Sequence, residues 1–106
     1  MRRLLLSSLL LVFVLSGEGG AAAAEKLDLA KGEHISIIGN TLADRMQHDA
    51  WLETLIYNRF PKHDLVIRNL GFSGDEVVTR QRSQNFGTPD EWLAKMHTDV
   101  VLAFFG

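Results

Sequence analysis

Three short apolar segments rich in β-branched residues recur along the chain, at residues 34–38, 65–67 and 100–105. Each is separated from the next by a stretch in which a helix is predicted. Helices between apolar strands require right-handed crossover connections, and such connections produce a parallel sheet. The third segment is apolar on both faces, as buried parallel strands are. The sequence therefore predicts an α/β fold with three parallel strands.

The first connection carries a helical pattern over residues 42–60. Its apolar positions fall near one stripe, and its charged positions lie mostly off that stripe. Pro61 ends the helix, because proline disfavours helical geometry at the residue before it. The stripe consists of Leu42, Met46, Leu52, Leu55, Ile56 and Phe60.

The second connection contains a strong helix start. Thr88 is expected to be the N-cap, Pro89 occupies the first helical position, and Glu91 completes a capping box. Ahead of this helix, residues 76–82 are weakly patterned and either helical or irregular, and residues 83–87 are expected to form a loop. The apolar face of the helix comprises Trp92, Leu93 and Met96.

Residues 1–24 have the order of a secretory signal peptide. Two arginines are followed by an apolar run over residues 4–15, and four alanines then offer a cleavage site. A membrane-anchoring helix is the alternative, but the apolar run is shorter than the ~20 residues that a bilayer span needs. We therefore expect a cleaved signal, no stable membrane span, a secreted or periplasmic location, and a mature domain at residues 25–106.

Composition removes several functional classes. The chain has no cysteine, which excludes disulfides and thiolate zinc sites. Its formal net charge of −2 gives no electrostatic case for binding nucleic acid. No pair among its four histidines has the spacing of metal ligands, so neither a metal nor a cofactor is predicted.

Small and polar residues follow each predicted strand. Gly39-Asn40-Thr41 follows the first strand, residues 69–75 follow the second, and Gly106 follows the third. In parallel sheets, ligands bind beyond the carboxyl ends of the strands. We expect these three segments to face one crevice.

The three segments resemble the sequence blocks of the SGNH, or GDSL-type, hydrolase family. The first block of that family is Gly-Asp-Ser-Leu, and Gly39-Asn40-Thr41-Leu42 stands in its place. The second block takes forms such as N-x-G-x-S-G-D, which residues 69–75 match as NLGFSGD. The third block begins with a glycine after the third strand, where this chain has Gly106. The resemblance covers residues 34–106.

The resemblance implies a flavodoxin-like three-layer sandwich and a serine-type ester hydrolase. Thr41 would occupy the nucleophile position, and Gly74 would supply an oxyanion-hole N–H. A hydroxyl at a helix N-terminus lies among free N–H groups, which can stabilise an anion developing on an ester carbonyl. The ligand would be a small-molecule ester of a carbohydrate or lipid, or a glycan. The expected binding residues are Gly39, Asn40, Asn69, Gly71, Ser73, Asp75 and Gly106.

The chain also departs from the family pattern. Thr41 replaces a serine, and its branched Cβ restricts the hydroxyl and crowds the attack. Asn40 replaces an aspartate. The family's later asparagine donor, its Asp-x-x-His pair and the strand outside the third one are absent from the sequence. We therefore expect residues 25–106 to be the N-terminal part of an incomplete SGNH-like domain that is inactive alone.

Each candidate residue has a structural alternative. Thr41-x-x-Asp44 is itself a helix-capping signal, which is favoured over a nucleophile. Gly74 can equally serve a turn, and a local hydrogen bond is favoured for Asn69. Residues 80–82, Arg-Gln-Arg, fit a solvated turn better than a contact for an acidic ligand. Two functions stay open: an ester hydrolase segment, and a non-catalytic binding or structural module of a larger secreted protein.

Overall fold

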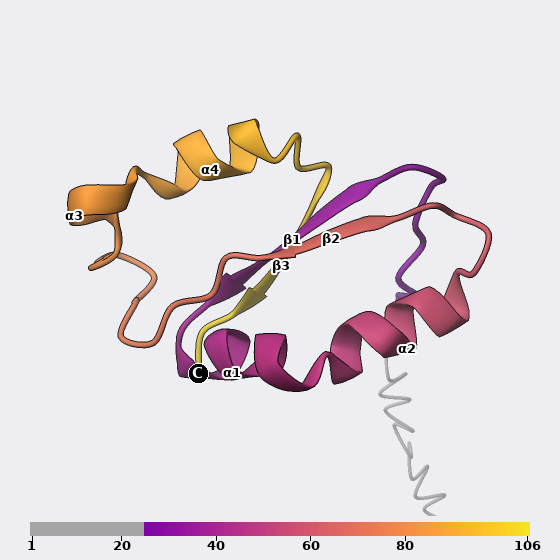
Figure 1. Ribbon diagram of the computed structural model, residues 1–106, viewed down its shortest axis with the longest axis horizontal. Coiled ribbons are helices and arrows are strands. Elements are labelled where there is room, and N and C mark those ends of the chain that lie inside the picture. The colour runs from indigo at the N-terminus through magenta and orange to yellow at the C-terminus, as the bar shows by residue number, and fades with distance from the viewer. Residues whose placement is uncertain (1–24) are drawn as a thin grey trace, which may run out of the picture.

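The computed structural model describes residues 25–106, so the signal peptide expected at residues 1–24 lies outside the described part. Figure 1 shows a central sheet with helices above and below it. The chain forms, in order, β1 (His34–Gly39), α1 (Thr41–Asp49), α2 (Trp51–Arg59), β2 (Val66–Asn69), α3 (Ser83–Phe86), α4 (Pro89–Lys95) and β3 (Val100–Phe104). Among residues 25–106, no helix has the length and apolar character needed to cross a bilayer.

The three strands form one parallel sheet in the order β2-β1-β3. His34 of β1 pairs with Val66 of β2, and Ile35 pairs with Val100 of β3. Each crossover passes through helices, as the alternation of apolar and helical segments predicts. The α/β prediction with three parallel strands is therefore confirmed, and the strand order is compatible with a flavodoxin-like fold.

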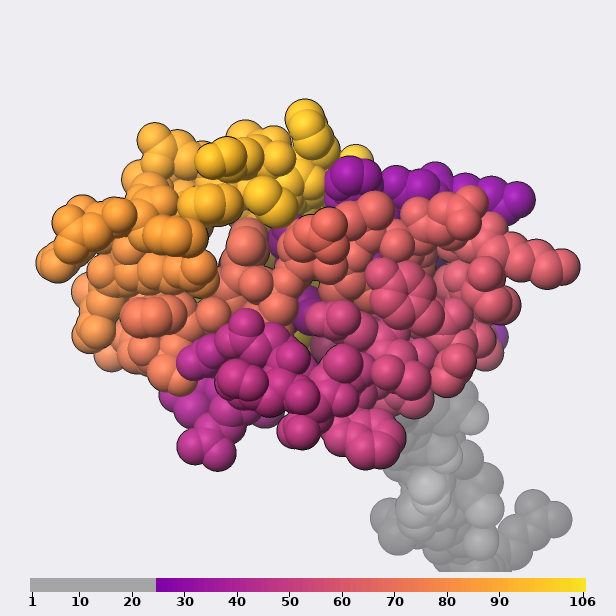
Figure 2. Space-filling view, viewed as in Figure 1, coloured from indigo at the N-terminus to yellow at the C-terminus, as the bar shows by residue number. Residues whose placement is uncertain are grey.

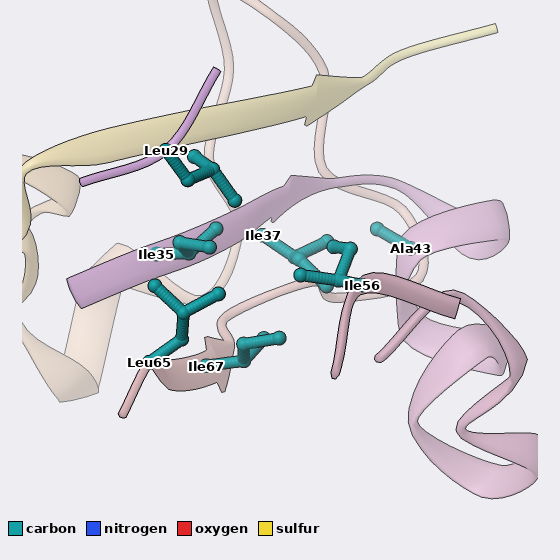
Figure 3. Packing of buried hydrophobic residues seen from close by; sticks show 7 residues of the cluster. All are labelled: Leu29, Ile35, Ile37, Ala43, Ile56, Leu65 and Ile67. Carbon is teal, nitrogen blue, oxygen red and sulfur yellow. The ribbon is translucent and has the colours of Figure 1, made fainter. Parts of the chain in front are cut away.

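The hydrophobic core lies between the sheet and the layer of α1 and α2 (Figure 3). Alternate residues of β1 point to this layer, because side chains of a strand alternate between its two faces. Ile35 and Ile37 are each 1% exposed and pack with Ala43 of α1 and Ile56 of α2. The whole cluster is Leu29, Ile35, Ile37, Ala43, Ile56, Leu65 and Ile67.

The single helix predicted over residues 42–60 is wrong, because Ala50 divides it into α1 and α2. Ala50 has left-handed backbone geometry, with φ 51°, and its N–H closes α1 by donating to the Met46 oxygen. The only buried residues of the two helices are Ala43 and Ile56. At about 100° per residue they would point about 140° apart on one straight helix. The break lets both face the sheet.

The predicted apolar stripe is confirmed in part, because Ile56 belongs to the core and Leu52 and Phe60 pack against it. Leu42 is 53% exposed and Leu55 is 63% exposed. The stripe is therefore wrong at these two positions.

The second connection differs from the prediction at residues 83–86 and agrees with it elsewhere. Residues 76–82 form no helix, whereas Ser83–Phe86 form the short helix α3 in place of the expected loop. The capping box of α4 is confirmed: Thr88 Oγ1 accepts from the Glu91 N–H, and a Glu91 carboxylate oxygen accepts from the Thr88 N–H.

Strand β3 is less buried than its apolar sequence predicts. Within the described residues it pairs with β1 alone, so it lies at an edge of the sheet. Val100, Leu102 and Phe104 pack against the core, but Val101, on the other face, is 44% exposed. The expectation of a strand buried on both faces is therefore wrong within the described residues.

The two helix starts give a paired stability prediction. Thr88→Ala is expected to lower the free energy of unfolding by about 1 kcal/mol, because it removes the oxygen that caps α4. Thr41→Ala is expected to leave it unchanged, since Thr41 is the first helical residue and makes no cap. Urea unfolding followed by circular dichroism measures both, and equal losses would contradict the assignment of the caps.

Candidate functional site

The segments that follow β1, β2 and β3 meet at the carboxyl end of the sheet. The Asn40 N–H donates to the Phe104 oxygen at 3.1 Å, and Asn40 Nδ2 donates to the Gly106 oxygen at 3.1 Å. From the second segment, the Phe72 N–H donates to the Gly39 oxygen at 3.1 Å. The three candidate segments therefore adjoin one another, and together they are called the rim.

Two glycines of the rim allow close backbone packing. A Cβ on Gly39 would overlap the Phe104 carbonyl oxygen, and Gly39 has φ +151°. A Cβ on Gly71 would stand 2.7 Å from the Asp44 nitrogen and 2.6 Å from the Ala43 Cβ. Gly39 thus keeps β1 against β3, and Gly71 keeps the loop against the first turn of α1.

Asp44 joins α1 to the loop beside Gly74. Its Oδ2 accepts from the Ser73 hydroxyl at 2.5 Å and from the Ser73 N–H at 3.2 Å, and its Oδ1 accepts from Gln47. The Ser73 hydroxyl holds the pKa of Asp44 below its ordinary value, and the other hydrogen bonds and His48 act in the same direction. The sequence predicts Asp44 only as part of a cap and Ser73 only as a ligand contact, because nothing in their spacing indicates that they pair.

The Asn69 side chain serves the fold of the loop. Its Nδ2 donates to the Ala43 oxygen at 2.7 Å, and its Oδ1 accepts from the Gly71 N–H at 2.8 Å. Both ends of the amide are therefore engaged within the protein. This matches the local hydrogen-bonding alternative for Asn69 rather than a contact with a ligand.

Thr41 and Gly74 are both exposed at the rim. Thr41 begins α1 after the N-cap Asn40, whose side chain makes no capping bond, so the capping role weighed for Thr41 is wrong. The first N–H groups of α1 therefore have no side-chain acceptor in the described part of the chain. Gly74 has φ +96° in a turn that the Asp75 N–H closes by donating to the Phe72 oxygen.

Asp75 is buried, whereas Thr41 is exposed at the rim. It is 6% exposed, and its Oδ1 accepts from the Arg82 backbone N–H at 3.4 Å. Its carboxylate therefore lies under the loop, on the side of the residues that precede α3.

None of the four histidines lies within hydrogen-bond reach of Thr41. His34 begins β1 at the other end of the sheet, about 16 Å from Gly39 along the strand. His63 and His97 precede β2 and β3, so they also belong to that end. His48 lies in the last turn of α1, about 10 Å from Thr41 along the helix axis. The described residues therefore place no histidine base beside the hydroxyl.

The ionisation of Asp44 gives a prediction about pH. Its folded pKa is lower than its ordinary value of 3.8, so its contribution to stability is present above that value and is lost as the pH falls through the folded pKa. Asp44→Asn is expected to lower the free energy of unfolding at about pH 7 and to have little effect at about pH 2. Urea unfolding at both pH values measures this.

Asp49→Asn is the matched control, because Asp49 is an exposed carboxylate at the end of the same helix. Its effect should be smaller at neutral pH. If the two variants behave alike, the hydrogen bonds from Ser73 do not stabilise the ionised carboxylate.

The rim thus combines a hydroxyl at a helix start, free backbone N–H groups and an exposed glycine in the facing loop. Among the described residues, no three His, Asp or Glu side chains form a group suited to a metal ion. Protein-family models, curated proteins and solved structures were each compared with the chain, and none matches it.

Proposed function

We propose that the rim is the nucleophile and oxyanion part of an SGNH-type ester hydrolase site. The Thr41 hydroxyl is the attacking group, and the N–H groups of Thr41 and Gly74 are the donors to the oxyanion. The observation that carries the proposal is the pair of hydrogen bonds between Ser73 and Asp44. These bonds tie the residue next to Gly74 to the first turn of the helix that Thr41 begins.

The chemistry of the proposed site requires one further group. When Thr41 Oγ bonds to the acyl carbon, its proton passes to a base, and the ester C–O bond breaks as the alcohol leaves with a proton. Water then hydrolyses the acyl-threonine and releases the acid. No histidine of residues 25–106 reaches Thr41, so the proposed reaction requires a base that these residues do not place beside the hydroxyl. The substrates are carboxylic esters of carbohydrate or lipid, met outside the cytoplasm.

A second candidate is a binding module without turnover. It is favoured by the distance of all four histidines from Thr41 and by Asn40, whose side chain is bound to the Gly106 oxygen instead of acting on a ligand. In this case the helix-start donors bind the carbonyl or carboxylate of a ligand, and nothing is cleaved.

Added imidazole distinguishes the two candidates, because it can replace a missing base. Without imidazole, the full chain is expected to hydrolyse p-nitrophenyl acetate no faster than Thr41→Ala. With imidazole, the hydrolase proposal expects a higher rate of hydrolysis for the wild-type chain than for Thr41→Ala. Imidazole also hydrolyses the ester by itself, but that rate is the same for both chains and cancels in the difference. Thr41→Ser should exceed both, because serine lacks the branched Cβ.

The Gly74→Ala variant serves as a control, since it keeps the proposed N–H donor. Imidazole-dependent rates that are identical in the wild-type chain, Thr41→Ala and Thr41→Ser would refute the nucleophile assignment. In that case, saturable shifts of the Thr41 and Gly74 backbone N–H resonances in a titration with acetate would support the binding module.

A further inference from the structure

A hollow lies on the opposite side of the sheet from the core, beneath α3 and α4. Figure 2 shows an opening between the orange α3–α4 segment and the central part of the molecule. The hollow is lined on one side by residues of the sheet and its following loop, and on the other by residues that precede or form these helices. Its lining includes Ile38, Leu70, Arg80, Arg82, Phe86 and Trp92.

Aromatic rings hold both arginines of this hollow in place. The Arg82 guanidinium carbon lies 4.1 Å from the centre of the Phe86 ring, and the Arg80 guanidinium carbon lies 4.5 Å from that of Phe105. Phe86 in turn stacks on Trp92, with ring centres 4.5 Å apart and an interplanar angle of 13°. Because Arg80 and Arg82 are half-buried against rings, their orientation is fixed more firmly than that of arginines in solvent.

The two guanidinium groups have unused hydrogen-bond donors. Within residues 25–106, neither lies within 4.0 Å of a carboxylate oxygen or donates a side-chain hydrogen bond. Asp75 is the one carboxylate among the described lining residues, and its Oδ1 accepts from the Arg82 backbone instead. Nearby Glu91 is engaged in the capping box of α4. Two positive groups therefore face the hollow beside one negative group.

We infer that this hollow binds a small organic carboxylate. An arginine fork matches a carboxylate with two parallel hydrogen bonds, and removal from solvent strengthens them. The apolar side of the hollow, formed by Ile38, Leu70 and Trp92, suits an apolar body attached to that carboxylate. The inference does not depend on catalysis by Thr41, and its test reads binding alone.

Benzoate is the probe, and the indole N–H resonance of Trp92 in the full chain is the readout. The sequence has two tryptophans, so Trp51→Phe assigns the two signals. Trp51 is 73% exposed on α2, away from the hollow, so its signal should not respond to benzoate. Benzoate is expected to shift the Trp92 signal in a saturable manner. Benzyl alcohol, with the same ring and no charge, should bind about tenfold more weakly or worse.

Substitutions test the arginines. Arg82→Gln and Arg80→Gln are each expected to weaken benzoate binding by about tenfold. Arg82→Lys keeps the charge but loses the fork, so its loss should be smaller. Arg59→Gln is the matched control, because Arg59 lies in α2 on the core side of the sheet and should leave the affinity unchanged.

Several results would overturn the inference. They are the absence of a saturable shift at Trp92, equal binding of benzoate and benzyl alcohol, and equal losses in Arg82→Gln and Arg59→Gln. A shift by inorganic phosphate as large as that by benzoate would show that the apolar side of the hollow contributes nothing. An Arg82→Gln chain that fails to fold is recognised by the loss of its helical circular dichroism signal, and Arg82→Lys then takes its place in the test.

Discussion

Gly39→Ala is expected to lower the free energy of unfolding by about 3 kcal/mol or more, a large part of the stability of a small domain. The added Cβ would overlap the Phe104 carbonyl oxygen, which is backbone and cannot rotate away. The same oxygen accepts from the Asn40 N–H. Relief therefore requires β1 and β3 to separate at the rim.

Gly32→Ala is the matched control for that variant. Gly32 also has a positive φ, +77°, but no atom lies within 4 Å of the Cβ it would gain. Its loss should be about 1 kcal/mol, from backbone strain alone. Urea unfolding followed by circular dichroism measures both variants. Equal losses would mean that the contact with Phe104 has no part in the stability of the sheet.

Gly71→Ala is expected to lower the free energy of unfolding by about 2 kcal/mol and to disturb the rim. Its Cβ would press on the Ala43 side chain and on the Asp44 nitrogen, both fixed in the first turn of α1. The loop must then move away from the helix. That movement weakens the hydrogen bonds from Ser73 to Asp44, so the Ser73 amide resonance should shift strongly.

Gly74→Ala is the comparison within the same loop. The nearest atom to its added Cβ is the Gln81 side-chain oxygen at 3.3 Å, which can move, so only the strain of φ +96° remains. That strain costs about 1 kcal/mol. The ranking would be wrong if Gly74→Ala destabilised the chain more than Gly71→Ala does.

The sequence contained enough information for the strands, their parallel pairing and the start of α4. Strand positions follow from β-branched runs such as residues 34–38, and the pairing follows from the length and helical pattern of the connections. The start of α4 is a local signal, because Thr88 and Glu91 satisfy each other's backbone without any tertiary contact. These features depend on near neighbours in the chain.

The break at Ala50 could not be predicted, because alanine is a strong helix former and carries no turn signal. The strain of its left-handed backbone is offset by the burial of both Ala43 and Ile56 against the sheet. The exposure of Val101 also depends on tertiary structure, because the apolar sequence of a strand does not determine which elements pack against each of its faces.

For the rim, the rule on the carboxyl ends of parallel strands correctly placed the three segments together. The roles of Thr41 and Gly74 stay predictions. The sequence singled out Gly74, whereas the structure shows that Gly71 makes the close contact with α1. The sequence favours a solvated turn for residues 80–82, because nothing in the spacing of the two arginines reveals the rings on which they lie.

The place of β1 in the sheet has a kinetic consequence. It is the first strand in the sequence and the central one in space, and its partners Val66 and Val100 lie 32 and 65 residues beyond His34 and Ile35. Such distant pairings give a high contact order, which slows folding. At roughly 5–20 residues per second, a nascent β1 waits seconds for each partner to be synthesised. An isoleucine-rich strand without neighbours thus makes early synthesis the stage at which this chain most needs protection from aggregation.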